Sequence, residues 1–243
     1  MKKLFWICAA IILHCGAATA TVSLINTRII YPAHARFVDI TAENSGKQSA
    51  QLLAWVDDGD FSSTPGTATA PFLLAPAVKV LGPGRKQVLR ISYNGSPLPL
   101  DRETVYYLNV TEIPPKVVGQ QDAQVMQFAV RTRIKIFMRP ANLPFSPELA
   151  AKKLSWELGA ASGDVVLRAK NPSPYFVSMA SVKLMRGDAM LSDLSRGMVP
   201  PWGELEFRPA QASADLAGAD AVKYIYVGDY GGGEELTFTL PVR

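Results

Sequence analysis

Residues 126–139 alternate between apolar and polar side chains over a longer stretch than an ordinary β-strand needs. One parity carries mostly apolar side chains, namely Met126, Phe128, Val130, Thr132, Ile134, Ile136 and Met138. The other parity carries Gln127, Arg131, Arg133, Lys135 and Arg139. Successive side chains of a strand point to opposite faces, so this period of two predicts a β-strand. Most strands have about 5–6 residues, so this one has length left over to offer to a partner.

The first 20 residues have the pattern of a secretory signal peptide. Lys2 and Lys3 precede an apolar run, residues 4–13, and small residues end at Ala20, after which we expect cleavage. The apolar run falls short of the ~20 residues of a membrane-spanning helix, and the bulky His14 before Cys15 disfavours a lipoprotein anchor. The pattern therefore predicts export without membrane insertion.

Export changes the cysteine content and charge of the chain. Both of its 2 cysteines, Cys8 and Cys15, lie in the expected leader, which excludes a secreted disulfide scaffold. Loss of Lys2 and Lys3 lowers the net charge from +4 to about +2. A charge this balanced gives no reason to expect binding to nucleic acid or to an anionic membrane.

Short alternating segments separated by turn residues occupy most of the remaining chain. Strands are expected at residues 37–42, 50–56, 88–93, 105–110, 154–158, 165–169, 176–184, 204–207, 224–227 and 236–240. Residues 140–146 are rich in proline and predict a linker, and residues 147–153 allow one helical turn. Many short strands without long amphipathic helices indicate an all-β chain of two β-sandwich domains, at residues 21–139 and 147–243.

The chain offers little for catalysis or metal binding. His34 is the only histidine outside the leader, which disfavours a Ser–His–Asp triad and a zinc site. Asp57-Asp58-Gly59-Asp60 could suggest calcium, but the EF-hand pattern is incomplete and a solvated turn is favoured. The glycines of residues 231–233 lack the Lys-Ser/Thr pair of a phosphate loop. We expect no enzyme activity, metal, nucleotide or cofactor.

Six motifs together resemble the periplasmic pilus-assembly chaperones of the chaperone–usher pathway. They run in order across nearly the whole chain after the leader: Thr27–Pro32, Asp101–Tyr107 with Asn109, Glu112–Pro115, Arg133–Pro140, Asn171–Tyr175 and Gly228–Gly232. The resemblance implies two immunoglobulin-like β-sandwiches set as an L or boomerang around a cleft.

The resemblance also implies a mechanism. Pilus subunits of this pathway are sandwiches that lack their last strand, and the chaperone lends them its own by strand addition. The donor strand would be residues 125–139, with Met126, Phe128 and Val130 filling the groove of the subunit. Ile134, Ile136 and Met138 would stay in the core of the chaperone.

Five further residues match positions with roles in the family. Arg28 and Lys135 match the pair that binds the C-terminal carboxylate of the subunit. Lys135 has the opposite parity to the groove-filling residues, and twist or a bulge could reconcile the two. Glu103, Arg139 and Asp229 match an interdomain salt-bridge trio that orients the domains.

The implied partners are pilus subunits and an outer-membrane usher, and the free protein could also cap itself as a homodimer. Two other classes stay open. A pilus subunit or adhesin domain would carry a disulfide and lack its last strand, unlike this chain. A secreted hydrolase would need more than the one histidine that remains.

Overall fold

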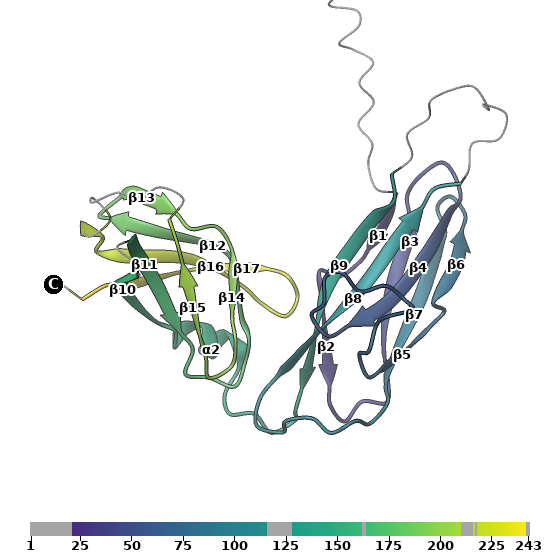
Figure 1. Cartoon of the computed structure of the whole chain (residues 1–243), viewed down its shortest axis with the longest axis horizontal. Coiled ribbons are helices and arrows are strands. Elements are labelled where there is room, and N and C mark those ends of the chain that lie inside the picture. The colour runs from purple at the N-terminus through teal and green to yellow at the C-terminus, as the bar shows by residue number, and fades with distance from the viewer. Residues whose placement is uncertain (1–20, 116–127, 162–163, 210–215, 217, 242–243) are drawn as a thin grey trace, which may run out of the picture.

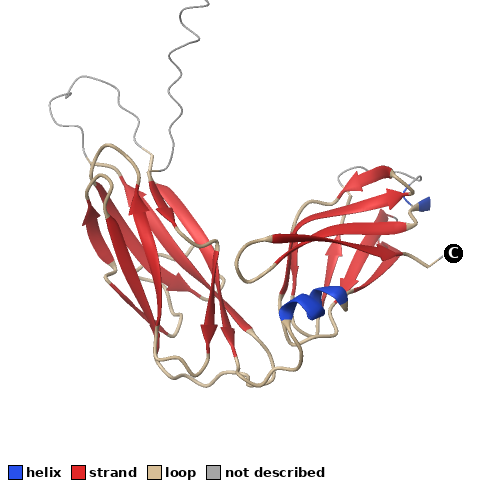
Figure 2. Cartoon of the chain, turned by 180° about the vertical axis from the view of Figure 1, so that it is seen from behind, coloured by secondary structure: helices blue, strands red, loops and turns tan. Residues whose placement is uncertain are grey.

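The computed structural model describes residues 21–115, 128–161, 164–209, 216 and 218–241. Their strands form two β-sandwiches that lie at an angle to each other, joined at one end (Figures 1 and 2). We call the part built from β1–β9 the first sandwich and the part built from β10–β17 the second sandwich. Residues 140–146, which connect them, contain no strand or helix. The all-β, two-sandwich architecture expected from the sequence is therefore confirmed.

The first sandwich consists of two sheets. Its strands are β1 (Val22–Leu24), β2 (Arg28–Pro32), β3 (Val38–Asn44), β4 (Ala50–Asp57), β5 (Phe72–Ala75), β6 (Val78–Leu81), β7 (Lys86–Tyr93), β8 (Thr104–Ile113) and β9 (Val130–Arg139). One sheet has the order β1-β3-β7-β5 and the other β2-β9-β8-β4-β6. The chain crosses from one sheet to the other between β1 and β2, so its first residues link both layers.

Alternating side chains explain the packing of β9 in this sandwich. Ile134, Ile136 and Met138 are buried in the core between the sheets, as expected. Lys135 and Arg139 have the other parity and point away from that core. Phe137 shares their parity and is nevertheless only 3% exposed, because Phe176 of the second sandwich packs on it with ring centroids 5.9 Å apart.

The strand β9 begins at Val130, later than the expected start of residue 125. Phe128 and Ala129 are described but lie outside any strand, and residues 125–127, with Met126, lie outside the described residues. The reason is the length of β8. Glu112 is in register with Val130, and β8 ends one residue later, so no described strand pairs with Phe128 or Ala129.

The second sandwich also has two sheets. Its elements are α2 (Pro147–Lys152), β10 (Ser155–Ala161), β11 (Asp164–Lys170), β12 (Val177–Arg186), β13 (Ala189–Asp193), β14 (Gly197–Val199), β15 (Glu204–Phe207), β16 (Ala221–Val227) and β17 (Gly233–Thr239). One sheet is β10-β11-β15, and the other is β13-β12-β16-β17 with β14 on β12. The side chain of Ser146 caps α2 by accepting from the amide of Leu149, at 3.3 Å.

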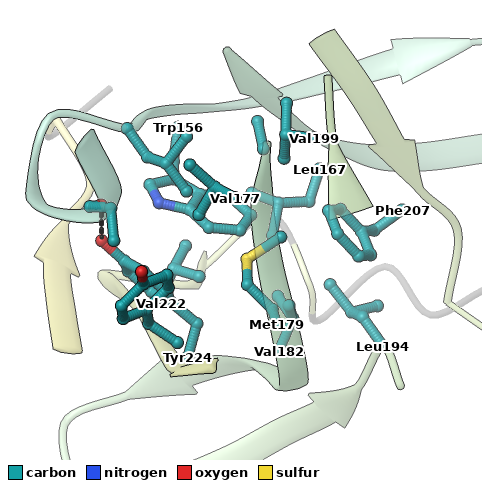
Figure 3. Close-up of a cluster of buried hydrophobic side chains, with 14 of the residues drawn as sticks. Trp156, Leu167, Val177, Met179, Val182, Leu194, Val199, Phe207, Val222 and Tyr224 are labelled. Carbon is teal, nitrogen blue, oxygen red and sulfur yellow. Dashed lines mark hydrogen bonds between the residues drawn. The ribbon is translucent and has the colours of Figure 1, made fainter. Parts of the chain in front are cut away.

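Aromatic side chains around Trp156 pack between these two sheets. Trp156 on β10 is 1% exposed and packs against Tyr224 on β16 and Phe207 on β15, with ring centroids 5.1 and 5.8 Å apart (Figure 3). The hydroxyl of Tyr224 donates to the carbonyl of Ala151 at 3.0 Å, which fastens α2 to the core.

Among the described residues, no helix is long and apolar enough to cross a membrane.

The aspartate cluster after β4 differs from the expected solvated turn in one respect. Asp58 and Asp60 are exposed, whereas Asp57 is fully buried under the outer face of the sheet. Its carboxylate accepts from Arg133 at 2.5 and 3.0 Å and from the amide of Asn109 at 2.6 Å. Arg133 has the same parity as Lys135, so the alternation of β9 brings its guanidinium over the end of β4. Asp57 is therefore a structural ion-pair partner, and no cluster of possible metal ligands occurs in the described part of the chain.

We expect Asp57→Asn to lower the free energy of unfolding at pH 7 by about 1.5–3 kcal/mol, the usual value of a charge-assisted hydrogen bond. Burial raises the pKa of Asp57, but hydrogen bonds from Arg133, Asn109 and Gly59 outweigh it and lower the pKa overall. A lowered carboxyl pKa gives stability that is present above the unfolded-state value of about 3.9 and is lost as the pH falls further. The loss of stability below pH 4 should therefore be shallower in Asp57→Asn than in the wild type.

Urea denaturation between pH 2 and pH 7 measures this difference. Asp39→Asn is the matched control, because Asp39 makes a two-bond pair with Arg90 at 2.9 Å on an exposed surface. It should change stability much less. Identical acid profiles for the wild type and Asp57→Asn would contradict the assignment.

Candidate functional site

Two cations meet where β2 pairs with β9. The strands are parallel, and Arg28 on β2 is in register with Lys135 on β9. Register neighbours in a sheet have side chains on the same face, so Arg28 and Lys135 project together from the first sandwich toward the second.

Arg28 is held by the second sandwich. Its Nη1 donates to the carbonyl of Val227 at 2.7 Å, and its guanidinium lies 5.9 Å from the ring centroid of Phe137. Its Nε is buried and has no hydrogen-bond partner in the described part of the structure. Burial lowers the pKa of Arg28 against the opposing pull of Tyr226, Asp229 and Glu103. The buried Nε–H is thus an unsatisfied donor of this guanidinium.

Lys135 is a half-buried cation without a counter-charge. Its Nζ lies 3.5 Å from the hydroxyl of Ser178 on β12, and none of the described carboxylates forms an ion pair with it. Burial lowers the pKa of Lys135, and the neighbouring charges of Arg28 and Arg196 lower it further. Two partly desolvated cations that form no ion pair with a described carboxylate make a site suited to an anion, and most of all to a carboxylate.

Arg139, at the end of β9, joins two carboxylates from different parts of the chain. Its Nε donates to Glu103 at 2.6 Å, and its Nη1 and Nη2 donate to the two oxygens of Asp229 at 2.6 and 2.8 Å. Asp229 lies in the loop between β16 and β17, so this interaction spans the two sandwiches. Burial acts to lower the pKa of Arg139, but Asp229 and Glu103 outweigh it and raise that pKa.

Glu103 connects the same network to the backbone of the second sandwich. Its carboxylate accepts from the amide of Phe176 at 2.8 Å, and its own amide donates to the carbonyl of Pro174 at 2.9 Å. The side chain is almost completely buried, and this burial raises the pKa of Glu103. The three charges that the sequence matched to an interdomain trio therefore lie in direct contact.

The N-terminal half of β9 has an open edge. Strand β8 pairs with β9 from Val130 to Met138, whereas β2 pairs with it only from Lys135 to Arg139. The edge of residues 130–134 opposite β8 therefore has no partner strand in the described structure. At its start Phe128 is 63% exposed and Val130 is 38% exposed. No register shift interrupts the pairing of β9 with β8, so Lys135 and Val130 lie on opposite faces of a regular strand.

Residues that sequence reasoning missed lie mainly on the second sandwich. Ser178, Val227 and Phe176 complete the surroundings of Lys135, Arg28 and Phe137. These contacts join residues that lie far apart in the sequence, up to 199 positions for Arg28 and Val227. A single sequence does not reveal them. One signal was available in Ile136-Phe137-Met138, because three consecutive apolar residues in a strand indicate cover on both faces.

The loop between β16 and β17 is shaped to fit against β2. Gly231 has φ +82°, and a Cβ built on it would lie 2.6 Å from the hydroxyl oxygen of Thr27. Gly231 thus combines a left-handed backbone with an approach too close for any side chain. This loop carries Asp229, so its fit against Thr27 helps to place the carboxylate that Arg139 binds.

Two family models match the chain. Residues 21–144 match the model described as "Pili and flagellar-assembly chaperone, PapD N-terminal domain". Residues 149–238 match "Pili assembly chaperone PapD, C-terminal domain". Together they cover both sandwiches.

Named relatives and solved structures agree with these models. The chain is 34% identical over 220 residues to the chaperone protein FimB/FhaD of Bordetella pertussis, which covers 89% of this chain and 86% of the relative. It resembles the crystal structure of the Pseudomonas aeruginosa CupB2 chaperone at 33% identity and a TM-score of 0.73, covering 90% of this chain and all of the other. The YadV chaperone structure is similar at 30% identity and a TM-score of 0.77, over 91% of this chain and all of the other. The chain therefore belongs to the PapD family of pilus-assembly chaperones.

Proposed function

We propose that this chaperone works in the periplasm, where it binds fimbrial subunits through the open edge of β9 and the cation pair Arg28 and Lys135. The open edge carries the argument. Unpaired strand edges readily take up a further strand, and here an edge of residues 130–134 ends beside two cations that form no ion pair with a described carboxylate. A solved structure of the same fold, at 24% identity, contains the SafA pilin of Salmonella enterica in complex with the SafB chaperone.

The proposed roles divide along β9. Main-chain groups of residues 130–134 pair with an edge of the subunit, and Phe128 and Val130, with Met126, fill its groove. Lys135 and Arg28 bind its C-terminal carboxylate on the cleft face. The two sets of side chains point to opposite faces, so they do not compete for space.

The other parts of the proposal rest on the family and on the leader. The family is one of chaperones, and we infer that the chain has no catalytic activity. The loaded chaperone passes its subunit to an outer-membrane usher. A free copy of the chain can cover the same edge by pairing with a second copy, which sedimentation analysis would detect.

Substitution of Lys135 should weaken subunit binding without lowering the free energy of unfolding of the chaperone. We expect Lys135→Gln to weaken binding of a subunit or of its C-terminal peptide by about 10- to 100-fold, which corresponds to ~1.5–3 kcal/mol for a charge-assisted hydrogen bond. Because Lys135 is partly desolvated and lacks an acidic partner, the same change should leave the free energy of unfolding unchanged or raise it. Calorimetric titration and urea denaturation measure the two quantities.

Two controls sharpen this test. Lys79→Gln changes an exposed lysine on β6 and should alter neither quantity. A peptide with an amidated C-terminus should bind the wild type and Lys135→Gln equally. Full binding of the free-acid peptide by Lys135→Gln would refute the carboxylate anchor.

Phe128 tests the groove-filling role. It is 63% exposed in the free protein, so Phe128→Ala should barely change stability. Burial of such a side chain against a subunit contributes roughly 1.5–3 kcal/mol, so we expect subunit affinity to fall about tenfold or more. Leu73→Ala is the matched control, since Leu73 is 71% exposed on β5, in the other sheet of the same sandwich. Equal affinities for wild type and Phe128→Ala would remove Phe128 from the proposed contact.

Gly231 tests whether the orientation of the sandwiches matters for binding. A Cβ at this position would push the β16–β17 loop away from Thr27 and pull Asp229 from Arg139. We expect Gly231→Ala to broaden the distribution of interdomain distances in X-ray scattering and to weaken subunit binding. Gly232→Ala is the neighbouring control, because nothing lies within 4 Å of its Cβ.

The clash can be separated from backbone strain, which alone costs about 1 kcal/mol. Thr27→Ala combined with Gly231→Ala removes the clash and leaves the strain. Restored binding in the double variant identifies the clash as the cause. Unchanged scattering and binding in Gly231→Ala would show that this loop does not set the orientation.

A further inference from the structure

Glu112, near the end of β8, gathers donors from the first residues of the described chain. The backbone amides of Thr21 and Val22 donate to its Oε2 at 2.8 and 2.9 Å. The hydroxyl of Thr21 donates to its Oε1. One partly buried carboxylate thus receives three hydrogen bonds from two consecutive residues.

The position of Thr21 is fixed from its other side as well. Its carbonyl accepts from the amide and the hydroxyl of Ser45, at 2.8 and 3.1 Å. A Cβ built on Gly46 would lie 2.6 Å from the Cβ of Thr21, so Thr21 packs directly on that glycine. A cavity of about 280 Å³ opens beside these residues and is lined in part by Lys47, Glu112 and Pro114. The backbone nitrogen of Thr21 is therefore held against Glu112 with space next to it.

Glu112 lacks a cationic partner in the described structure. No ion pair within 4.0 Å involves it, and Lys47, although it lines the same cavity, makes no such contact. A partly buried carboxylate with hydrogen bonds but no counter-charge is incompletely compensated. An added positive charge at the nitrogen of Thr21 would supply what is missing.

We propose that Glu112 is the binding site for the α-ammonium group that cleavage of the leader creates on Thr21. Hydrolysis of the peptide bond between Ala20 and Thr21 consumes one water and leaves a carboxylate on Ala20 and an ammonium on Thr21. The nitrogen that is 2.8 Å from Glu112 as a neutral amide then becomes a cation at the same place. The proposal rests on the periplasmic location of the proposed function and on the cleavage after Ala20 that the leader sequence predicts.

The new ion pair would join the two sheets of the first sandwich. Thr21 leads into β1, which pairs with β3 in one sheet, whereas Glu112 belongs to β8 in the other. Glu112 is also in register with Val130, where the open edge of β9 begins. Leader cleavage therefore stabilises the end of the sandwich next to the edge that receives a subunit, and the uncleaved chain lacks this ion pair.

A double-mutant cycle tests the proposal on the complete mature chain. Two chains are released from a removable fusion partner: one begins at Thr21, and the other keeps Ala17–Ala20. The four extra residues can move the ammonium by up to ~13 Å while leaving an amide at Thr21. Each chain is made as wild type and as Glu112→Gln, and unfolding in urea is measured at pH 7.

The expected result is an equilibrium constant for unfolding about fivefold larger in the extended chain than in the chain that begins at Thr21. In the Glu112→Gln background this difference should fall below about twofold. Glu157→Gln, which removes an exposed partner of Lys170 in the second sandwich, is the matched control and should preserve the full difference.

Two results of the urea measurements would overturn the proposal. Equal stability of the two wild-type chains would show that the ammonium contributes nothing, and a difference that persists in Glu112→Gln would assign it to another contact. The intact mass of the protein purified from the periplasm independently reports the cleavage site. A start other than Thr21 would remove the ion pair from the mature protein, whereas failure of the proposed function would appear instead as loss of subunit binding.

Discussion

The guanidinium of Arg139 is the interaction on which the arrangement of the two sandwiches depends. It lies at the last residue of β9 and contacts Glu103 before β8 and Asp229 in the β16–β17 loop. Exposed ion pairs contribute only about 0–1 kcal/mol, but this one is shielded, bidentate toward Asp229 and continued by the bond from the amide of Phe176 to Glu103. Its directional contacts restrict how the second sandwich can tilt. That restriction keeps Arg28 and Lys135 facing Val227 and Ser178 of the second sandwich.

Two groups lack a partner within a few residues of each other in the described structure of the free protein. Lys135 is a cation without a described acidic partner, and residues 130–134 have an edge without a neighbouring strand. Each is unfavourable in isolation, since partly buried charges and unpaired strand edges both call for compensation. A strand that ends in a carboxylate would satisfy both at once. In our proposal, the stability that the chaperone gives up in its free form becomes affinity for a subunit.

The sequence was sufficient for the strands whose alternation is regular and whose ends carry turn residues. Strand β15 has the expected bounds, and β3, β4, β7 and β8 differ by a few residues at their ends. The short edge strands β5 and β6, between Pro71 and the turn at Gly82, escaped prediction. Phe72 and Leu74 of β5 face the core, but four residues are too few for a clear alternation, and most side chains of β6 are exposed. The start of β9 was placed too early, since alternation continues past the point where β8 stops. Asp57 was taken as solvated because its cover comes from Arg133, 76 positions away. The cation pair was matched by resemblance, but the parallel register of β2 and β9, which brings the two residues together, is a property of the fold.

In the proposed complex, the distance between Lys135 and the groove-filling residues limits how the subunit strand can pair with β9. From Val130 to Lys135 a strand rises about 3.3 Å per residue, or roughly 17 Å in all. A partner strand whose terminal carboxylate is held at Lys135 has only one register available along the open edge. A slip of one residue would turn every groove-facing side chain to the opposite face, and a slip of two would separate the carboxylate from both cations. Because β9 runs through this stretch without a bulge, a carboxylate held at Lys135 would, in our proposal, determine which face of the strand meets the subunit. The regular pairing of β9 with β8 therefore keeps the distance between Lys135 and Val130 constant, and this constant distance would select the register of a bound strand.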